Sequence, residues 1–324
     1  MKRVWVLGAG GMLGASVTRE LGRDVAEVYR YREPFEWWRP HRLRAQIKEA
    51  ISGFLTCLTA GDAWEIYWAA GVGSMGSSRA DLDGETAALD CFLVSLEQHL
   101  LSCSIPGVFG FASSAGALYA GSKDFEITEH TPVTVANHYA EAKLVQERLL
   151  QDFASRQAAA YVLIARFSTL YGPGQAQGKR QGLLSHVARC ALRNQPIEIF
   201  VPLDTLRDYL FIDDAASDFV NSSQALLAGL DRFHVKIIAA ERSVTISEII
   251  ATFNRVNKRR MRVICNRNNL SALYAPRVAY RSISTLAGDR STRRHTLLEG
   301  AAALLRAERM AYIAGLNIGQ RVNQ

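Results

Sequence analysis

Short apolar runs alternate with longer amphipathic stretches along the first half of the chain, which is the pattern of strands that alternate with helices. The apolar runs predict strands at 3–7, 26–30, within 62–71, at 108–112 and at 161–167. The amphipathic stretches predict helices at 15–21, 43–58, 85–101 and 139–156. Because a helix follows each strand, the strands are expected to lie parallel. The pattern predicts an α/β fold with a doubly wound parallel sheet.

The alternation of strands and helices becomes less regular beyond residue 175. Helices are predicted there at 182–193 and 215–230. Ser247 is placed to cap a further helix that runs to about Val256. No low-complexity linker and no internal repeat marks a boundary. We expect 1–174 to form one domain, with some later segments returning to it, and 175–324 to form mainly a smaller α/β domain.

A glycine-rich turn, Gly8-Ala9-Gly10-Gly11-Met12-Leu13-Gly14, joins the first predicted strand to the first helix. Strand, glycine turn and helix in this order are typical of a dinucleotide site. Gly8 permits the tight turn, Gly11 lets the backbone approach a pyrophosphate, and Gly14 lets the helix pack on the strand. Met12 and Leu13 are therefore expected among the cofactor contacts. The alternative is a purely structural glycine turn.

Two further stretches bear on a cofactor. Arg30 and Arg32 stand near the end of the second predicted strand, where an acid would hold the ribose of NAD and an Arg would accommodate the 2′-phosphate of NADP. They favour NADP, although solvated arginines on a loop explain them equally well. The small residues Ala69, Ala70 and Gly71 end the third strand and would let the backbone pass close to a cofactor.

Tyr139 and Lys143 are four residues apart on a predicted helix, so their side chains share one face. An ammonium one turn away favours the phenolate and could bring the pKa of the Tyr into a useful range. Ser113 and Ser114, at the end of the fourth strand, offer a hydroxyl to the same oxygen. Such a Tyr–Lys spacing also occurs by chance as an exposed helix pair.

The chain has a formal net charge of +7 and a pI near 9.3, which suits anionic small ligands such as diphosphates. No nucleic-acid-binding motif accompanies the charge, so no nucleic-acid partner is expected. The five cysteines are widely spaced and the seven histidines lack metal-ligand spacing, which predicts reduced thiols and no metal. No apolar run approaches the length of about 18 residues that spans a membrane. A soluble, cytoplasmic protein is expected.

Taken in order, these motifs resemble those of the extended short-chain dehydrogenase/reductase family, the NAD(P)-dependent epimerase/dehydratase group that acts mainly on nucleotide sugars. The resemblance covers nearly the whole chain. It includes Gly8-x-x-Gly11-x-x-Gly14, Ala69-Ala70-Gly71, Ser113 to Tyr119, Tyr139-x-x-x-Lys143, Arg166 with Tyr171-Gly172-Pro173-Gly174, Arg207-Asp208-Tyr209 with Asp213-Asp214, and Ile246 to Ile249. It implies a Rossmann-type sheet with a smaller C-terminal α/β substrate-binding domain.

The resemblance also implies roles. Tyr139 would be the acid/base, Lys143 would lower its pKa and bind the nicotinamide ribose, and Ser114 or Ser113 would bind the reacting oxygen. The three glycines would line the pyrophosphate of NAD or NADP. Arg207, assisted by Arg277, would bind the diphosphate of a nucleotide sugar. Asp213 and Asp214 look structural, and a homodimer through 85–101 and 138–156 is expected.

Three departures from the family pattern bear on the reaction. Ala115 replaces the third Ser or Thr, so which serine supplies the hydroxyl stays open, and Thr169 replaces a substrate-contacting Asn. Gly116 and Ala117 replace the Asp-Glu pair of dehydratases, which disfavours elimination. An epimerase acting at C4 through a keto intermediate is favoured over an NADPH-dependent 4-keto-sugar reductase. A non-catalytic NAD(P)-binding protein is the third alternative.

Overall fold

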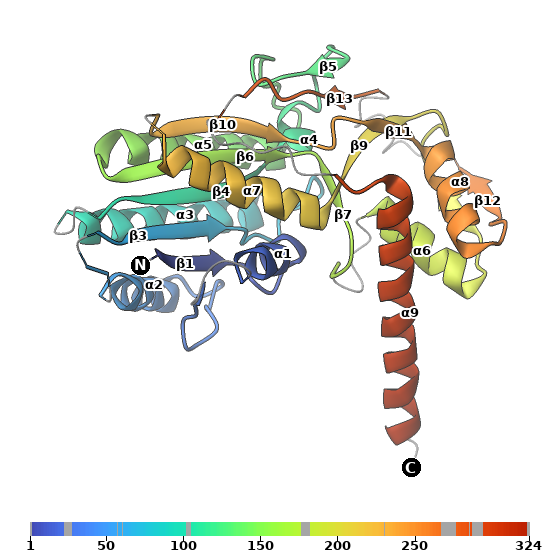
Figure 1. Cartoon of the computed structure of the whole chain (residues 1–324), viewed down its shortest axis with the longest axis horizontal. Coiled ribbons are helices and arrows are strands. Elements are labelled where there is room, and N and C mark those ends of the chain that lie inside the picture. The colour runs from blue at the N-terminus through green and yellow to red at the C-terminus, as the bar shows by residue number, and fades with distance from the viewer. Residues whose placement is uncertain are drawn as a thin grey trace.

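The structure is a computed structural model that describes residues 2–22, 28–56, 58–59, 61–101, 105–175, 182–229, 231–266, 277–284, 286 and 294–322, with side chains of the last helix described to residue 314. Its centre is a six-stranded parallel sheet in the order β10-β6-β4-β3-β1-β2 (Figure 1). The strands are β1 (Lys2–Leu7), β2 (Val28–Tyr29), β3 (Ala63–Trp68), β4 (Gly107–Ser114), β6 (Ala160–Phe167) and β10 (Phe233–Ile238). The predicted doubly wound α/β fold is confirmed.

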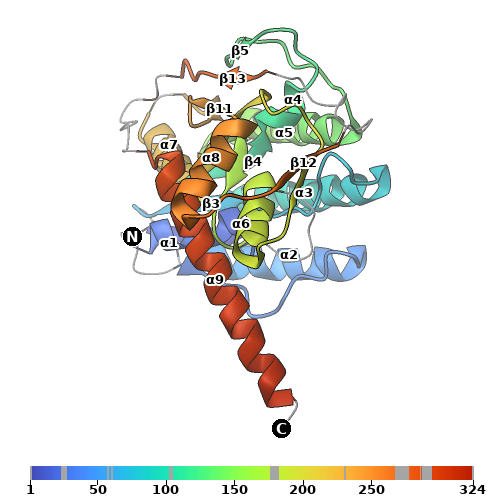
Figure 2. The ribbon, with the colours of Figure 1, turned by 90° about the vertical axis from the view of Figure 1, so that its right-hand side faces the viewer.

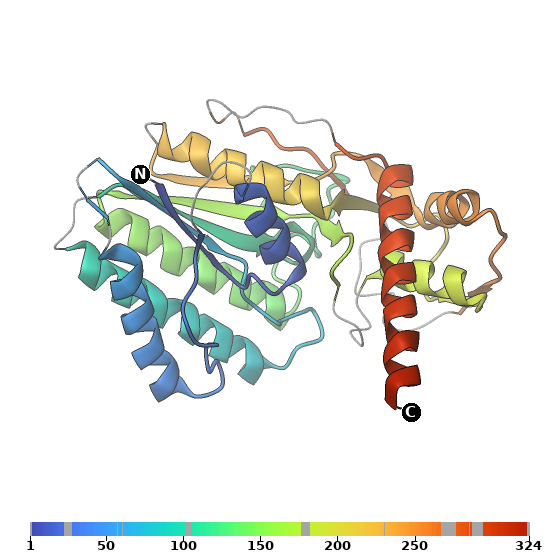
Figure 3. The same cartoon turned by 60° about the horizontal axis from the view of Figure 1, so that its bottom comes forward.

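Helices cover both faces of this sheet, as Figure 3 shows. One face carries α1 (Met12–Leu21) and α7 (Ile212–Leu227), which pack against each other. The other carries α2 (Pro40–Leu55), α3 (Arg79–Leu100) and α5 (His138–Arg156). The strands in the middle of the sheet are therefore apolar on both faces, which explains their continuous hydrophobic runs.

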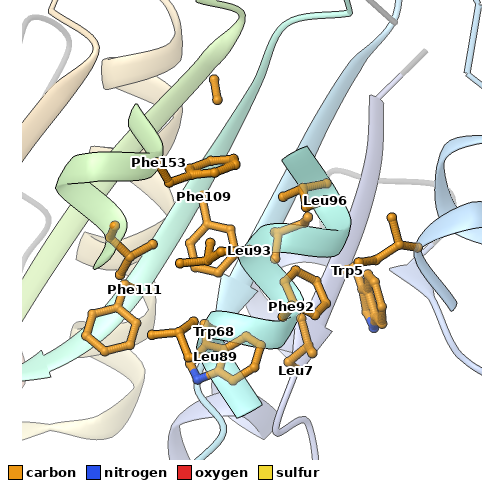
Figure 4. Close-up of a cluster of buried hydrophobic side chains, with 14 of the residues drawn as sticks. Trp5, Leu7, Trp68, Leu89, Phe92, Leu93, Leu96, Phe109, Phe111 and Phe153 are labelled. Atoms are coloured by element: carbon orange, nitrogen blue, oxygen red, sulfur yellow. The ribbon is translucent and has the colours of Figure 1, made fainter. Parts of the chain in front are cut away.

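The larger core lies between the sheet and α2, α3 and α5. Figure 4 shows its aromatic centre, in which Trp68 and Phe109 of the sheet face Phe92 of α3. Each of these side chains is at most 4% exposed. Burying a side chain of this size stabilises the fold by roughly 1.5–3 kcal/mol. The core fixes the strand ends from which the functional residues project.

The second part of the molecule is built from short strands and helices. A three-stranded sheet contains β7 (Thr169–Tyr171), β9 (Leu206–Phe211) and β11 (Ser243–Thr245), and β8 (Ile197–Ile199) pairs with β12 (Val263–Cys265). The helices are α6 (Leu183–Arg193), α8 (Ile246–Asn257) and α9 (Leu297–Val322), and α9 extends away from the body (Figures 1 and 2). The strands β5 (Glu126–Ile127) and β13 (Ala279–Tyr280) form a further parallel pair.

Several element boundaries differ from those expected from the sequence. The α8 helix is capped by Thr245, whose hydroxyl and Glu248 form a capping box, so the Ser247 cap was wrong. A short helix, α4 (Ala115–Leu118), follows β4 directly. The α3 helix begins six residues before 85, at Arg79, because Ser78 accepts a hydrogen bond from the amide of Asp81.

Candidate active site

The glycine turn after β1 is required by the close approach of β3. Gly8 has φ +86°, and a Cβ there would lie 2.6 Å from the backbone of Ala69 and Ala70. A Cβ on Gly14 would lie 2.2 Å from the carbonyl oxygen of Gly8. Any larger residue at either glycine would separate α1 from the strand ends. The predicted roles of these glycines in the turn and in helix packing thus have a steric basis.

The N-terminus of α1 suits an anionic group. Gly11 is its N-cap, no side chain caps it, and its first turn contains no acidic residue. By contrast, Ser78 and Asn137 cap α3 and α5. The first amides of α1 are thus left for a ligand, and the helix dipole favours a negative charge there. A pyrophosphate fits this end of the helix.

A cavity of about 190 Å³ opens beside this turn, at the carboxyl ends of β3, β4 and β6. Open α/β sheets bind ligands at this edge. Of the residues predicted from the sequence, the cavity is lined by Leu13, Ala69, Ala70, Gly71, Ser113, Ser114, Tyr139 and Lys143. The remaining lining residues are Gly73, Glu85, Ala112, Phe167, Ser168 and Leu170. The cavity therefore lies between Leu13 of the glycine turn and the Tyr–Lys pair.

Lys143 is buried at the base of this cavity, with its side chain pointing to β4. Its ammonium donates hydrogen bonds to the carbonyl of Ala112 at 3.3 Å and to Oε1 of Gln146 at 3.1 Å. Burial lowers the pKa of Lys143 from 10.5 to about 8, and the charges of Glu85 and Glu147 oppose that lowering. An ammonium has three N–H donors, so one remains for a ligand in the cavity.

Tyr139 lies one turn from Lys143, whose Nζ is 5.8 Å from the centroid of the Tyr139 ring. Burial, assisted by the charge of Glu85, raises the pKa of Tyr139 to about 12. The expected lowering of the pKa of Tyr139 is therefore wrong, because burial of the phenol dominates that pKa. Tyr139 carries its proton at neutral pH.

The two serines at the end of β4 have different environments. Ser113 is buried and donates to Oε1 of Glu147 at 2.5 Å, and Arg166 binds both oxygens of Glu147 at 3.1 and 2.6 Å. Ser114 accepts a hydrogen bond from the amide of Ala117 at 3.2 Å. No acceptor for its own proton occurs among the described residues. Ser114 is thus the serine whose hydroxyl proton can meet a ligand, and Ala115, fully buried, offers none.

Ser114 lines the cavity, whereas the other predicted substrate residues, Thr169, Arg207 and Arg277, lie outside its lining. Thr169 is exposed, and its neighbours Ser168 and Leu170 line the cavity instead. Arg207 is on β9, next to the bridge that pairs Leu206 with Arg277, so the two arginines lie on adjacent segments. The side chain of Arg277 is exposed and lies 3.7 Å from Asp204.

The carboxylates at the start of α7 have structural contacts. Asp213 accepts hydrogen bonds from Ser16 and Arg19 of α1, both at 2.9 Å. Asp214 binds His295, through the backbone amide at 2.7 Å and the ring at 2.6 Å. The first ties α7 to α1, and the second ties it to the segment that leads into α9.

The arginines after β2 also differ from each other. Arg32 forms an ion pair with Glu49 at 2.5 Å. Arg30 is exposed and makes no ion pair within the part of the chain that the structure describes. If either binds a 2′-phosphate, Arg30 is the one whose charge is available.

Sequence reasoning missed Glu85, whose carboxylate lines the cavity from α3. A single Glu in an amphipathic helix carries no local signal, so only the packing of α3 beside β3 reveals it. No group of residues suited to hold a metal ion occurs among the described residues. No helix in the described ranges has the length and apolarity to cross a bilayer.

A doubly wound parallel sheet with a glycine turn at its first helix and a Tyr–Lys pair at the strand ends is the architecture of dinucleotide-dependent short-chain dehydrogenases/reductases. Residues 4–226 match the model of the NAD dependent epimerase/dehydratase family. The chain belongs to this family.

Similar proteins include both epimerases and reductases. The Escherichia coli dTDP-4-dehydro-6-deoxyglucose reductase is 27% identical over 150 residues, 46% of each chain. This chain matches each of its curated relatives over less than half of the relative's length. The Thermotoga maritima UDP-glucose 4-epimerase with UDP-glucose has a TM-score of 0.75 at 17% identity, over 96% of this chain and 100% of that one. MoeE5 with UDP-glucuronic acid and NAD has a TM-score of 0.76 at 20% identity, over 95% and 99%. At these identities the structural likeness shows the fold.

Proposed function

We propose that this protein is an NAD(P)-dependent nucleotide-sugar epimerase that acts at C4 through a transient keto sugar. The observation that carries the proposal is the single cavity in which Ser114, Tyr139 and Lys143 meet beside the glycine turn. Family membership supports hydride-transfer chemistry on a nucleotide sugar. The solved epimerase with UDP-glucose supports the fit of such a substrate to this fold.

In this proposal the bound dinucleotide supplies a hydride acceptor, then a hydride donor. Oxidation at C4 requires that Tyr139 first lose the proton that it carries at neutral pH. The phenolate then takes the proton of the C4 hydroxyl as the hydride leaves C4, and returns it after the keto sugar has rotated in the site. Ser114 donates a hydrogen bond to the same oxygen, which stabilises the charge that develops there. Lys143 binds a ribose hydroxyl with its remaining N–H, and its positive charge acts against the effect of burial on the pKa of Tyr139.

The rest of the ligand is assigned by chemistry. The uncapped start of α1 at Gly11 takes the pyrophosphate of the cofactor. We assign the substrate half mainly to residues 175–324, where Arg207, with Arg277 beside it, takes the diphosphate of the nucleotide sugar. The bidentate guanidinium matches two phosphate oxygens. The diphosphate therefore anchors the substrate while the keto sugar rotates in the cavity.

A reductase that uses NADPH to reduce a 4-keto sugar once is the second candidate. Two observations favour it. Tyr139 carries its proton at neutral pH, which suits protonation of a carbonyl oxygen. Arg30 is exposed at the end of β2, where it suits a 2′-phosphate. The E. coli reductase among the similar proteins is consistent with this alternative.

The test offers the purified protein UDP-, GDP- and dTDP-sugars while the absorbance of reduced nicotinamide is followed. An isomer formed without net cofactor turnover identifies an epimerase, and stoichiometric consumption of NADPH with a 4-keto sugar identifies a reductase. Tyr139→Phe is expected to lose a factor of about 10²–10⁴ in kcat with unchanged cofactor affinity. Parent-like turnover in Tyr139→Phe with every accepted substrate would contradict the mechanism.

A further inference from the structure

Glu85 reaches the cavity from the second turn of α3 and binds the loop that follows β3. Its Oε1 accepts hydrogen bonds from the backbone amides of Val72 and Gly73, both at 2.6 Å. Bonds of a carboxylate to amide N–H groups are among the stronger ones in proteins. One oxygen of Glu85 is therefore fully used in holding the backbone beside the cavity.

The second oxygen, Oε2, is left open. A Cβ added at Gly71 would lie 3.3 Å from this oxygen, and one added at Gly73 would lie 3.1 Å from it. Side chains at these two positions would therefore crowd it, and the glycines leave it uncovered. Within the described ranges of the chain, no donor hydrogen-bonds to Oε2. Glu85 lines the cavity, so its carboxylate oxygen without a donor is an acceptor available to a ligand there.

The ligand group that suits this oxygen is a hydroxyl. A phosphate or carboxylate would be repelled by Glu85, whereas a hydroxyl donates a hydrogen bond to it. Lys143 lines the same cavity and has an N–H donor left. A donor and an acceptor in one cavity suit a vicinal diol, in which one hydroxyl accepts and the next donates.

We propose that Glu85 is a ligand-binding residue whose Oε2 accepts a hydrogen bond from a diol hydroxyl of the bound ligand, while its Oε1 holds residues 72 and 73. This inference rests on the proposed function. Both the ribose next to the nicotinamide and the hexose of a nucleotide sugar carry such a diol. The experiment distinguishes these two sources.

The variant is Glu85→Gln, because its amide oxygen still accepts from Val72 and Gly73 while its NH₂ cannot accept from a hydroxyl. Asp83→Asn is the matched control, since it removes the same charge from an exposed position on α3. The dissociation constants of NAD⁺ and NADPH are measured by quenching of tryptophan fluorescence, and KM is measured with each accepted nucleotide sugar. A hydrogen bond to a charged group is worth about 1.5–3 kcal/mol, so we expect a loss of affinity of roughly tenfold or more in Glu85→Gln.

A weaker cofactor affinity with an unchanged KM for the sugar assigns the hydroxyl to the ribose, and the reverse assigns it to the hexose. Either result supports the proposal, provided that Asp83→Asn behaves like the parent. If Glu85→Gln keeps both values within twofold of the parent and unfolds at the same temperature, the proposal is overturned. If Glu85→Gln fails to fold, Glu85→Asp takes its place, because its shorter carboxylate cannot reach both the loop and the ligand.

Failure of the proposal for Glu85 can be distinguished from failure of the proposed function. A parent that binds cofactor but turns over no nucleotide sugar overturns the proposed function. The proposal for Glu85 is then decided by cofactor affinity alone, and a parent-like dissociation constant in Glu85→Gln overturns it. A parent that binds neither NAD⁺ nor NADPH overturns both.

Discussion

Ser113 donates a buried hydrogen bond of 2.5 Å to Glu147, and this bond gives the two adjacent serines of β4 different tasks. Glu147 is also held by Arg166, so Ser113 belongs to a buried ion pair that links α5 to the sheet. Ser114, one residue further, lines the cavity with its hydroxyl proton available. Ser113 thus has a structural contact, whereas the hydroxyl of Ser114 is the one available for the proposed chemistry.

The serines are therefore expected to differ on replacement by Ala. Ser113→Ala removes one partner of a buried carboxylate, so the free energy of unfolding is expected to fall by about 1–3 kcal/mol while kcat changes little. Ser114→Ala removes a donor to the reacting oxygen, so kcat is expected to fall by about 10²-fold with little change in stability. Urea unfolding and steady-state kinetics on both variants check this. If Ser113→Ala lost activity and Ser114→Ala lost stability, the structural and chemical roles of the two serines would have to be exchanged.

The glycine turn predicts an effect on stability with a control inside the same turn. Gly8→Ala places a Cβ 2.6 Å from the backbone of Ala69 in a left-handed conformation, so β1 and β3 must separate. A loss of about 1–3 kcal/mol in the free energy of unfolding is expected. Gly10→Ala is the control, because nothing lies within 4 Å of its Cβ. Equal unfolding midpoints for the two variants in urea would show that the close approach of residue 8 to Ala69 does not determine stability.

The lowered pKa of Lys143 is expected to make the free energy of unfolding depend on pH. Its pKa in the folded protein is about 8, below the ordinary value of 10.5. Between these values the unfolded chain binds more protons than the folded one, so this group makes stability rise with pH. The rise in the free energy of unfolding is on the order of 3 kcal/mol if the window is crossed completely.

The measurement is the free energy of unfolding of the parent and of Lys143→Met at pH 7, 8, 9 and 10. Below pH 10 the raised pKa of Tyr139, which acts in the opposite direction, has little effect. The stability of Lys143→Met relative to the parent is expected to decrease as the pH rises. A difference between the two proteins that does not change with pH would contradict the lowered pKa of the buried Lys143.

Much of the fold follows from local sequence. The strand, the glycine turn and the helix at the N-terminus are adjacent in the chain, so their spacing alone predicts them. Tyr139 and Lys143 are also close in sequence, and a helix brings them together. These features depend on contacts within a few residues, which a sequence pattern records directly.

The remaining features depend on contacts between distant segments. Ser113 pairs with Arg166 across β4 and β6, and this register gives Ser113 its structural partners. Glu85 reaches the site only because α3 packs beside the loop after β3. The pKa of Tyr139 rises because the surrounding elements bury it, which its spacing from Lys143 does not reveal. The helical spacing predicted that Tyr139 and Lys143 share one face, but it gave no information on the burial that sets the pKa of Tyr139.

The two arginines after β2 give a matched test of cofactor preference. Arg30 is exposed and suited to a 2′-phosphate, whereas Glu49 already neutralises Arg32. Arg30→Ala is expected to weaken NADPH binding by about tenfold and to leave NADH binding unchanged, because only NADPH carries the additional phosphate. Arg32→Ala should affect both cofactors equally and weakly.

The two dissociation constants are measured for each variant by tryptophan fluorescence, at two salt concentrations. The contribution of Arg30 comes from an exposed charge, so it should shrink as salt is added. If Arg30→Ala leaves the ratio of the NADPH and NADH constants as it is in the parent, the end of β2 does not select the phosphate. Preference for NADPH would then have to arise elsewhere, and the reductase alternative would lose the support of Arg30. If the ratio changes only in Arg30→Ala, the end of β2 is the place where the two cofactors are distinguished.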